Sequence, residues 1–178
     1  MNINDKHLEE VRRDAINNAV PIIKKPKAAW LLQFIQQHKP VKILELGTAI
    51  GYSGIILGSE GGYLTTIELS HKEIQKARKY LRKAGTKFTI IYGDAIPQTK
   101  LLVEEGKKYD LVFVDFMNSQ YCDVYENCVA LVKQNGFIIT DNINHDHSKE
   151  FKEKLTDDSR LETEIIDIGD GMSVSRKN

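Results

Sequence analysis

The sequence lacks the features that would place it outside the ordinary soluble globular proteins. None of its apolar runs approaches the roughly 20 residues that a membrane span requires. Its polar start, mixed in charge, has neither the apolar centre of a secretion signal nor the acid-poor composition of a transit peptide. We therefore expect a cytoplasmic protein with no membrane contact.

Cysteine is also scarce. The two cysteines, Cys122 and Cys128, are six residues apart in one expected helix. This spacing puts them on different faces of the helix, so they suit neither a disulfide nor a metal pair. We expect two buried thiols in a reducing compartment.

An excess of charge is absent too, because 25 basic residues balance 25 acidic ones. This balance argues against nucleic-acid binding by bulk electrostatics, but it leaves room for a local basic face. Residues 72–87 carry seven basic side chains and one acid, Glu73. The solvated side of an amphipathic helix explains them first, and a phosphate-contacting patch for RNA is the alternative. The basic residues are Lys72, Lys76, Arg78, Lys79, Arg82, Lys83 and Lys87.

Length and patterning predict a single domain, residues 1–178, with N-terminal helices in 1–38 and a core in 41–176. Apolar strands alternate with helices, which indicates parallel pairing through right-handed crossovers. We expect strands at 41–46, 63–68, 88–92, 109–115 and 137–141, and helices at 5–19, 26–38, 52–60, 70–84, 96–105, 119–133 and 148–155. A closing hairpin, 161–168 and 172–176, adds antiparallel strands. The pattern predicts an α/β fold with an open, doubly wound, Rossmann-like sheet, mostly parallel.

In such sheets, ligands lie beyond the carboxyl ends of the strands. The first strand ends in Glu45 and Leu46, followed by the loop Gly47-Thr48-Ala49-Ile50-Gly51. Ala49 breaks the Gly-x-Gly-x-x-Gly pattern of nicotinamide-binding proteins, which argues against an oxidoreductase. An acid before the first glycine favours S-adenosylmethionine instead. The alternative is a purely structural turn between a strand and a helix.

The next two strand ends also carry acids. Glu68 lies 21 residues beyond Gly47, where a carboxylate can accept hydrogen bonds from both ribose hydroxyls. Asp94, in Gly93-Asp94-Ala95, can accept from an adenine amino group. Either acid alone is more simply a solvated strand end, and the spacing from the glycine loop favours the cofactor role.

The fourth and fifth strands end in Asp115 and in Asp141-Asn142. Two carboxylates and an amide at one rim suit a divalent cation, Mg²⁺ first of all. The alternative is that each acid merely ends its strand. His145 and His147 follow, and we interpret them as part of a polar loop rather than as a transition-metal pair.

Together these motifs resemble the cation-dependent, S-adenosylmethionine-dependent O-methyltransferases related to catechol and caffeoyl-CoA methyltransferases. The resemblance covers roughly residues 26–176. Its motifs are Ile43–Thr48 with Gly51-Tyr52-Ser53, the strand to Glu68, Tyr109–Asp115 with Tyr121, Asn135–Asn142 and Gly169-Asp170-Gly171-Met172.

The resemblance implies roles for individual residues. The metal ligands would be Asp115, Asp141 and Asn142, and the cation would lower the pKa of the attacking hydroxyl of the acceptor. The enzyme would then align that oxygen with the sulfonium methyl group. The implied cofactor-binding residues are Glu45, Gly47, Thr48, Gly51, Tyr52, Ser53, Glu68, Leu69, Gly93, Asp94, Ala95, Asp115 and Phe116.

The sequence departs from the family at three places. Many relatives have a lysine, as base or charge partner, where this chain has Asn118, which we keep beside Asp115 as a candidate catalytic position. The loop after Asn142 and the N-terminal segment are short, although both normally shape substrate choice and dimer contacts. An open site would suit a large acceptor, a polyphenol or a hydroxylated tRNA base such as the wobble uridine that some bacterial relatives methylate.

The main hypothesis is therefore a metal-assisted O-methyltransferase for a catechol-like acceptor or a tRNA base. The alternative is a non-catalytic S-adenosylmethionine-binding module that works with a partner. A homodimer is compatible with either.

Overall fold

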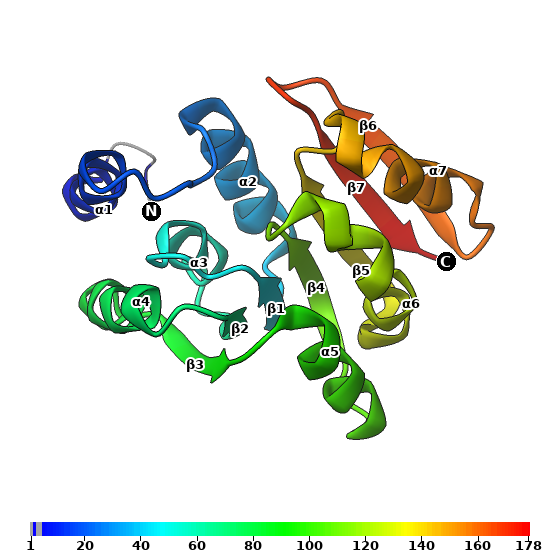
Figure 1. Cartoon of the computed structure of the whole chain (residues 1–178), viewed down its shortest axis with the longest axis horizontal. Coiled ribbons are helices and arrows are strands. Elements are labelled where there is room, and N and C mark those ends of the chain that lie inside the picture. The colour runs from blue at the N-terminus through cyan, green and yellow to red at the C-terminus, as the bar shows by residue number, and fades with distance from the viewer. Residues whose placement is uncertain (1, 3–4) are drawn as a thin grey trace.

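The computed structural model describes residue 2 and residues 5–178, and one seven-stranded sheet forms its centre (Figure 1). The strands are β1 (Lys42–Leu46), β2 (Tyr63–Glu68), β3 (Lys87–Tyr92), β4 (Tyr109–Val114), β5 (Val132–Asp141), β6 (Leu161–Ile166) and β7 (Met172–Lys177). Their order in space is β3-β2-β1-β4-β5-β7-β6. The chain thus runs outward from β1 in both directions, which creates a switch point between β1 and β4.

Pairing in the sheet is parallel from β3 to β5 and antiparallel from β5 to β6. β7 lies between β5 and β6, so the second strand of the closing hairpin is inside the sheet and the first forms its edge. This arrangement confirms the predicted doubly wound sheet with antiparallel C-terminal strands.

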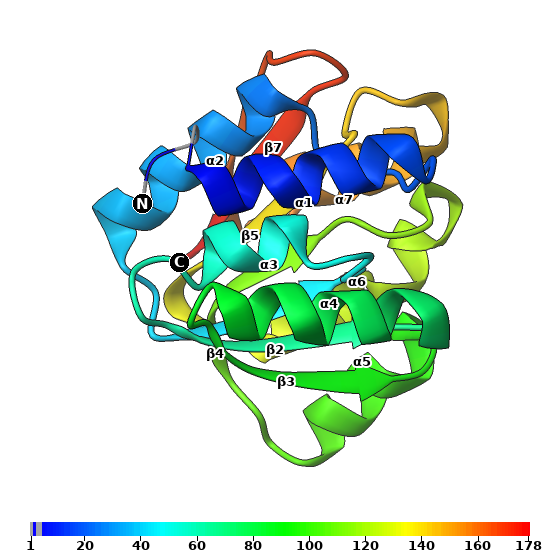
Figure 2. The ribbon, with the colours of Figure 1, turned by 90° about the vertical axis from the view of Figure 1, so that its left-hand side faces the viewer.

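Helices cover both faces of the sheet (Figures 1 and 2). They are α1 (Lys6–Asn17), α2 (Lys25–His38), α3 (Tyr52–Leu57), α4 (His71–Lys83), α5 (Ala95–Glu104), α6 (Tyr121–Leu131) and α7 (Lys149–Asp157). Alternate residues of a strand point to opposite faces. Leu111 and Phe113 of β4 therefore pack with α1 to α4, whereas Val112 and Val114 pack with α5 to α7. The central strand β4 is largely apolar, as expected of a strand with both faces buried.

Several boundaries differ from the prediction by a few residues, and two of these differences have a clear physical cause. α6 ends at Leu131 and β5 begins at Val132, because Val132 already pairs with Tyr109 before the register shifts between Tyr109 and Leu111. α1 ends at Asn17 rather than at 19, and Ala19 has a φ of +53°, which no α-helix accommodates. Both differences concern the ends of elements and leave the topology as predicted.

The structure also bears on membrane contact and on the cysteines. In the described part of the chain, residue 2 and residues 5–178, no helix is long and apolar enough to cross a membrane. Both cysteines are free; Cys128 is buried as predicted, whereas Cys122 is only half-buried.

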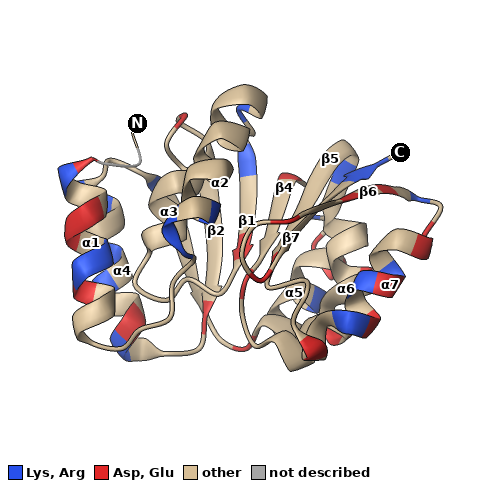
Figure 3. Cartoon of the chain, turned by 90° about the horizontal axis from the view of Figure 1, so that it is seen from above, with Lys and Arg blue, Asp and Glu red and all other residues tan. Residues whose placement is uncertain are grey.

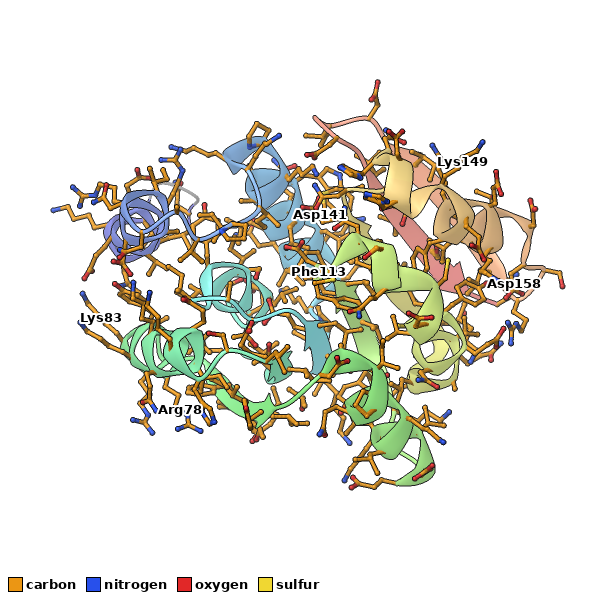
Figure 4. All side chains as sticks on the ribbon, viewed as in Figure 1. Arg78, Lys83, Phe113, Asp141, Lys149 and Asp158 are labelled. Carbon is orange, nitrogen blue, oxygen red and sulfur yellow. The ribbon has the colours of Figure 1, made fainter. Side chains whose placement is uncertain are left out.

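The basic helix α4 packs against α1. Lys76 pairs with Asp14 at 2.9 Å and Lys83 pairs with Glu10 at 2.5 Å. Blue and red side-chain positions accordingly alternate where the two helices meet (Figure 3). Arg78 and Lys83 lie at the edge of the molecule, well apart from Asp141 at its centre (Figure 4). The basic side chains Arg78 and Lys83 of α4 therefore lie on the β3 side of the sheet, and not at the ends of β4 and β5.

Candidate active site

A cavity of about 770 Å³ opens at the carboxyl ends of the strands. This is the edge at which an open α/β sheet binds its ligands, and the volume suits a small-molecule site. The predicted site residues that line it are Gly47, Thr48, Tyr52, Ser53, Glu68, Leu69, Gly93, Asp94, Ala95, Asp115, Phe116, Asn118, Asp141 and Asn142. Glu45 and Gly51 are not among the lining residues.

The glycine loop begins with a close approach of two backbones. Gly47 has a φ of +97°, and a Cβ atom there would lie 2.0 Å from the carbonyl oxygen of Asp115. The amide of Asp115 donates to the carbonyl of Leu46 at 3.0 Å, so the ends of β1 and β4 are joined. Only glycine combines this dihedral angle with this contact.

Glu68 ties the glycine loop to the end of β2. One carboxylate oxygen accepts from the amide of Ala49 at 2.8 Å, and the other accepts from the amide of Ser70 at 2.8 Å. Ala49 itself has a φ of +44°, which is uncommon for a residue with a side chain. Each carboxylate oxygen has a further lone pair, so Glu68 can also accept from a ligand in the cavity.

Glu45, in β1, and Gly51, the last residue of the loop, both face away from the cavity. Glu45 is fully buried, and its carboxylate accepts from the hydroxyls of Ser53 and Thr66, both at 2.6 Å. Burial raises the pKa of Glu45 to about 7 despite these two donors. Gly51 faces α4, where a Cβ atom would lie 3.3 Å from the Leu81 side chain. Both residues support the loop from below.

Asp94 forms the margin of the cavity at the end of β3. Its side chain caps α5 by accepting from the amide of Ile96 at 2.8 Å. The amide of Gly93 donates to the carbonyl of Glu68 at 3.0 Å. This bond holds Asp94 and Ala95 next to the end of β2.

The opposite end of the cavity gathers acidic side chains around one lysine. Lys27 of α2 forms ion pairs with Asp141 and with Asp170, which lies in the turn between β6 and β7. Burial and the neighbouring charge of Asp141 hold the pKa of Asp115 well above its ordinary value. Burial also raises the pKa of Asp141, although Lys27 opposes this effect. At Asp170 the effect of burial is outweighed by Lys27, which lowers the pKa to about 2.

These residues do not fit the predicted divalent cation. The structure does bring Asp115, Asp141 and Asn142 to one rim, as predicted. However, Oδ1 of Asp141 already accepts from the ammonium group of Lys27. Among the residues that the structure describes, no third His, Cys, Asp or Glu side chain completes a metal-binding group with these two carboxylates, so the amide of Asn142 would have to be the third ligand.

Three further polar residues that the sequence singled out are Asn118, His145 and His147. Asn118, in a short 3₁₀ turn after β4, lines the cavity where the resemblance places a lysine. The exposed rings of His145 and His147 stack on each other at 5.3 Å in the loop after β5. Both histidines therefore lie in an exposed polar loop.

Lys27 and Asp170 are the site residues that sequence reasoning missed. A lysine in the first turn of a helix is ordinarily solvated, and no local pattern marks Lys27 as buried. Asp170 stands in the motif Gly169-Asp170-Gly171-Met172, but nothing in the sequence gave it a role in the site. The segment Asn18–Lys24 also contributes to the wall of the cavity, although nothing in its composition indicates a site.

The charge of the cavity bears on its ligand. Six acidic and two basic side chains line it. The acidic side chains are Glu68, Glu73, Asp94, Asp115, Asp141 and Asp170, and the basic ones are Lys24 and Lys27. This excess of negative charge favours a cationic ligand over an anionic one such as a dinucleotide pyrophosphate. Fold and site together define a class of protein that binds a cationic, nucleoside-like cofactor at the ends of a doubly wound sheet.

Comparisons with known proteins identify the family. The sequence profile described as O-methyltransferase matches residues 2–178. The caffeoyl-CoA O-methyltransferase of Stellaria longipes is 25% identical over an alignment of 201 residues. The alignment covers 97% of this chain and 83% of that protein. The catechol O-methyltransferase of Niastella koreensis is 33% identical over 128 residues, which cover 68% of this chain and 58% of that protein. The chain therefore belongs to the O-methyltransferase family of enzymes.

Solved structures agree with this assignment. A Staphylococcus aureus protein, provisionally named a caffeoyl-CoA O-methyltransferase, superposes with a TM-score of 0.86 at 29% identity, over 96% of this chain and 92% of that one. An O-methyltransferase from Bacillus cereus, solved in complex with SAH, has a TM-score of 0.86 at 22% identity, over 98% and 92% of the two chains. The predicted Rossmann-like methyltransferase fold is thus confirmed.

Proposed function

We propose that this chain transfers a methyl group from S-adenosylmethionine to a hydroxyl oxygen of an aromatic acceptor. The observation that carries the proposal is one cavity in which Glu68 and Asp94, at the ends of β2 and β3, share a lining with Lys27, Asp115 and Asp141. A cationic cofactor suits the acidic lining of this cavity.

The cofactor half is built from the first three strand ends. The glycine loop from Gly47 lets the backbone approach the methionine part, and Thr48, Tyr52 and Ser53 line the same wall. Glu68 accepts from the ribose hydroxyls, and Asp94 and Ala95 border the adenine. When bound, S-adenosylmethionine supplies the methyl group on its sulfonium.

The acceptor half is built from the ends of β4 and β5 and from α2. Asn118 and the ammonium group of Lys27 line this part of the cavity and carry N–H donors for an acceptor oxygen. Their work is to hold that oxygen in line with the methyl group, which is largely a positioning task. The divalent cation expected at Asp141 has no part in this proposal, because Lys27 already pairs with that carboxylate.

The acceptor we favour is a small catechol-like or phenolic molecule. Relatives named for catechol and caffeoyl-CoA support this choice. A hydroxylated tRNA base is the second candidate, and the position of the basic helix α4, away from Asp141, weighs against it (Figure 4). A cytoplasmic location and a homodimer stay predictions.

Calorimetric titration with S-adenosylhomocysteine tests the cofactor half. We expect wild-type protein to bind with and without EDTA, and Glu68→Ala to lose about tenfold or more in affinity, because a hydrogen bond between a charged group and the ligand is worth about 1.5–3 kcal/mol. Glu60→Ala, at an exposed acid in the loop before β2, is the matched control and should bind as wild type does. Failure of the wild-type protein to bind S-adenosylhomocysteine would contradict the proposal.

Methyl transfer from labelled S-adenosylmethionine then tests the acceptor half. Catechol, caffeoyl-CoA and tRNA with a hydroxylated wobble uridine are compared at equal protein concentration. Transfer to one of the phenolic molecules supports the favoured acceptor, and transfer to tRNA alone supports the second candidate. Tight cofactor binding with no transfer to any of them favours a non-catalytic binding module.

A further inference from the structure

A lysine ammonium group is buried among the carboxylates of the acceptor half. The side chain of Lys27 is 2% exposed, and its ion-pair partners Asp141 and Asp170 are 4% and 33% exposed. Lys27 comes from α2, Asp141 ends β5, and Asp170 lies between β6 and β7. Three segments that are far apart in the sequence therefore meet at one nitrogen atom.

The charges at this point depend on one another. An ammonium group with so little exposure is stable only where carboxylates pair with it. Conversely, neighbouring carboxylates such as Asp115 and Asp141 repel each other unless a positive charge lies between or beside them. In this chain Lys27 supplies that positive charge from within the protein.

The ammonium group also takes a ligand atom that a metal would need. Oδ1 of Asp141 accepts from Nζ of Lys27. A Mg²⁺ ion lies about 2.0–2.1 Å from its oxygen ligands, so an ion on Asp141 would stand beside Nζ. Two cations at that separation repel strongly in a partly buried site. Metal binding at this oxygen of Asp141 therefore requires the displacement of a buried lysine.

The position of the lysine is the reverse of what the family resemblance implies. The resemblance places a lysine at position 118 and a metal at Asp141. Here position 118 is an asparagine that lines the cavity, and the lysine stands at the metal position. The site keeps a cation at Asp141, although that cation is now a side chain.

We propose that the ammonium group of Lys27 replaces the divalent cation in this chain, so that methyl transfer needs no added metal. The claim about transfer rests on the proposed function, whereas the claim about metal binding stands without it. Lys27 carries three N–H groups, of which one is donated to Asp141 and a second faces Asp170 in an ion pair. The third is available to an acceptor oxygen in the cavity.

Titration of the whole chain with Mn²⁺, followed by electron paramagnetic resonance, tests the binding claim. The signal of free Mn²⁺ reports how much ion is bound. We expect wild-type protein to bind no Mn²⁺ at this site, and Lys27→Met to gain one ion per chain. Lys24→Met is the matched control, because Lys24 pairs with Asp170 at 3.3 Å but has a side chain that is 70% exposed. It should gain no site.

Two results of the titration would overturn the proposal: one Mn²⁺ bound per wild-type chain, or a folded Lys27→Met protein that binds none. If Lys27→Met does not fold, the titration of wild-type protein decides, since a bound ion contradicts the proposal and its absence supports it.

Methyl transfer by wild-type protein in EDTA tests the second claim. We expect the rate to stay within about twofold of the rate with Mg²⁺. A tenfold loss in EDTA that Mg²⁺ restores would contradict the proposal. Failure of S-adenosylhomocysteine to bind would remove the proposed function, yet the Mn²⁺ titration would still decide the role of Lys27.

Discussion

The carbonyl oxygen of Asp115 leaves no room for a side chain at position 47. A Cβ atom on Gly47 would lie 2.0 Å from that oxygen. The first strand end and the fourth are thus in contact through their backbones. This contact places the cofactor end of the cavity directly beside the carboxylates of the acceptor end.

We expect Gly47→Ala to destabilise the protein by about 2–5 kcal/mol, as left-handed strain of about 1–2 kcal/mol adds to overpacking of about 1–3 kcal/mol. Urea unfolding measures this change. Gly85→Ala is the control, because Gly85 has a φ of +73° but nothing within 4 Å of a Cβ atom. It should lose only the strain energy, and equal losses in the two variants would contradict the role of the contact.

The buried carboxyl of Glu45 should make the stability of the protein depend on pH. Its pKa is raised by burial from 4.5 to about 7. The stability that this group contributes is therefore fully present below pH 4.5 and is lost as the pH rises through 7. The loss amounts to about 3 kcal/mol.

Glu45→Gln removes this titration, so the stability of the variant relative to wild type should increase as the pH rises. Urea unfolding of both proteins between about pH 5 and pH 8 measures the trend. Glu60→Gln, at an exposed acid, serves as the control. A stability difference that does not change with pH would show that Glu45 does not titrate in this range.

Loss of Lys27 should cost far more stability than loss of Lys24. Lys27→Met leaves a buried carboxylate without its cation, which costs about 3–5 kcal/mol. Lys24→Met removes an exposed ion pair and should cost less than about 1 kcal/mol. The double variant Lys27→Met with Asp141→Asn should recover part of the loss, because the unpaired charge is gone. Additive losses in this double-mutant cycle would mean that the two groups are not coupled.

The basic helix offers a test of the acceptor. Arg78 and Arg82 are exposed on α4, and Arg78 lies away from Asp141 (Figure 4). We expect Arg78→Glu with Arg82→Glu to change the KM for a phenolic acceptor by less than about twofold, because exposed charges beyond a Debye length are screened. A rise in KM for tRNA that weakens with added salt would instead indicate an RNA-binding surface.

Much of this site could be predicted from the sequence because it depends on local order. Each acid and glycine that follows a strand stays at that strand's end, and parallel strands bring their carboxyl ends to one edge. Glu68, Asp94, Asp115 and Asp141 therefore lie around one cavity as predicted. The same reasoning could not separate the lining residues from Glu45 and Gly51, because a position in a motif does not say which way a side chain points.

The order of strands and helices, the glycine loop and the acids at the strand ends could be predicted from the sequence, since these follow from periodicity and from turns a few residues long. Which cation stands among the acids depends instead on contacts between distant segments. Lys27 and Asp141 are 114 positions apart, and their pairing depends on how α2 packs over β5 and the β6–β7 turn. That packing results from burial summed over the whole core, which no local pattern records.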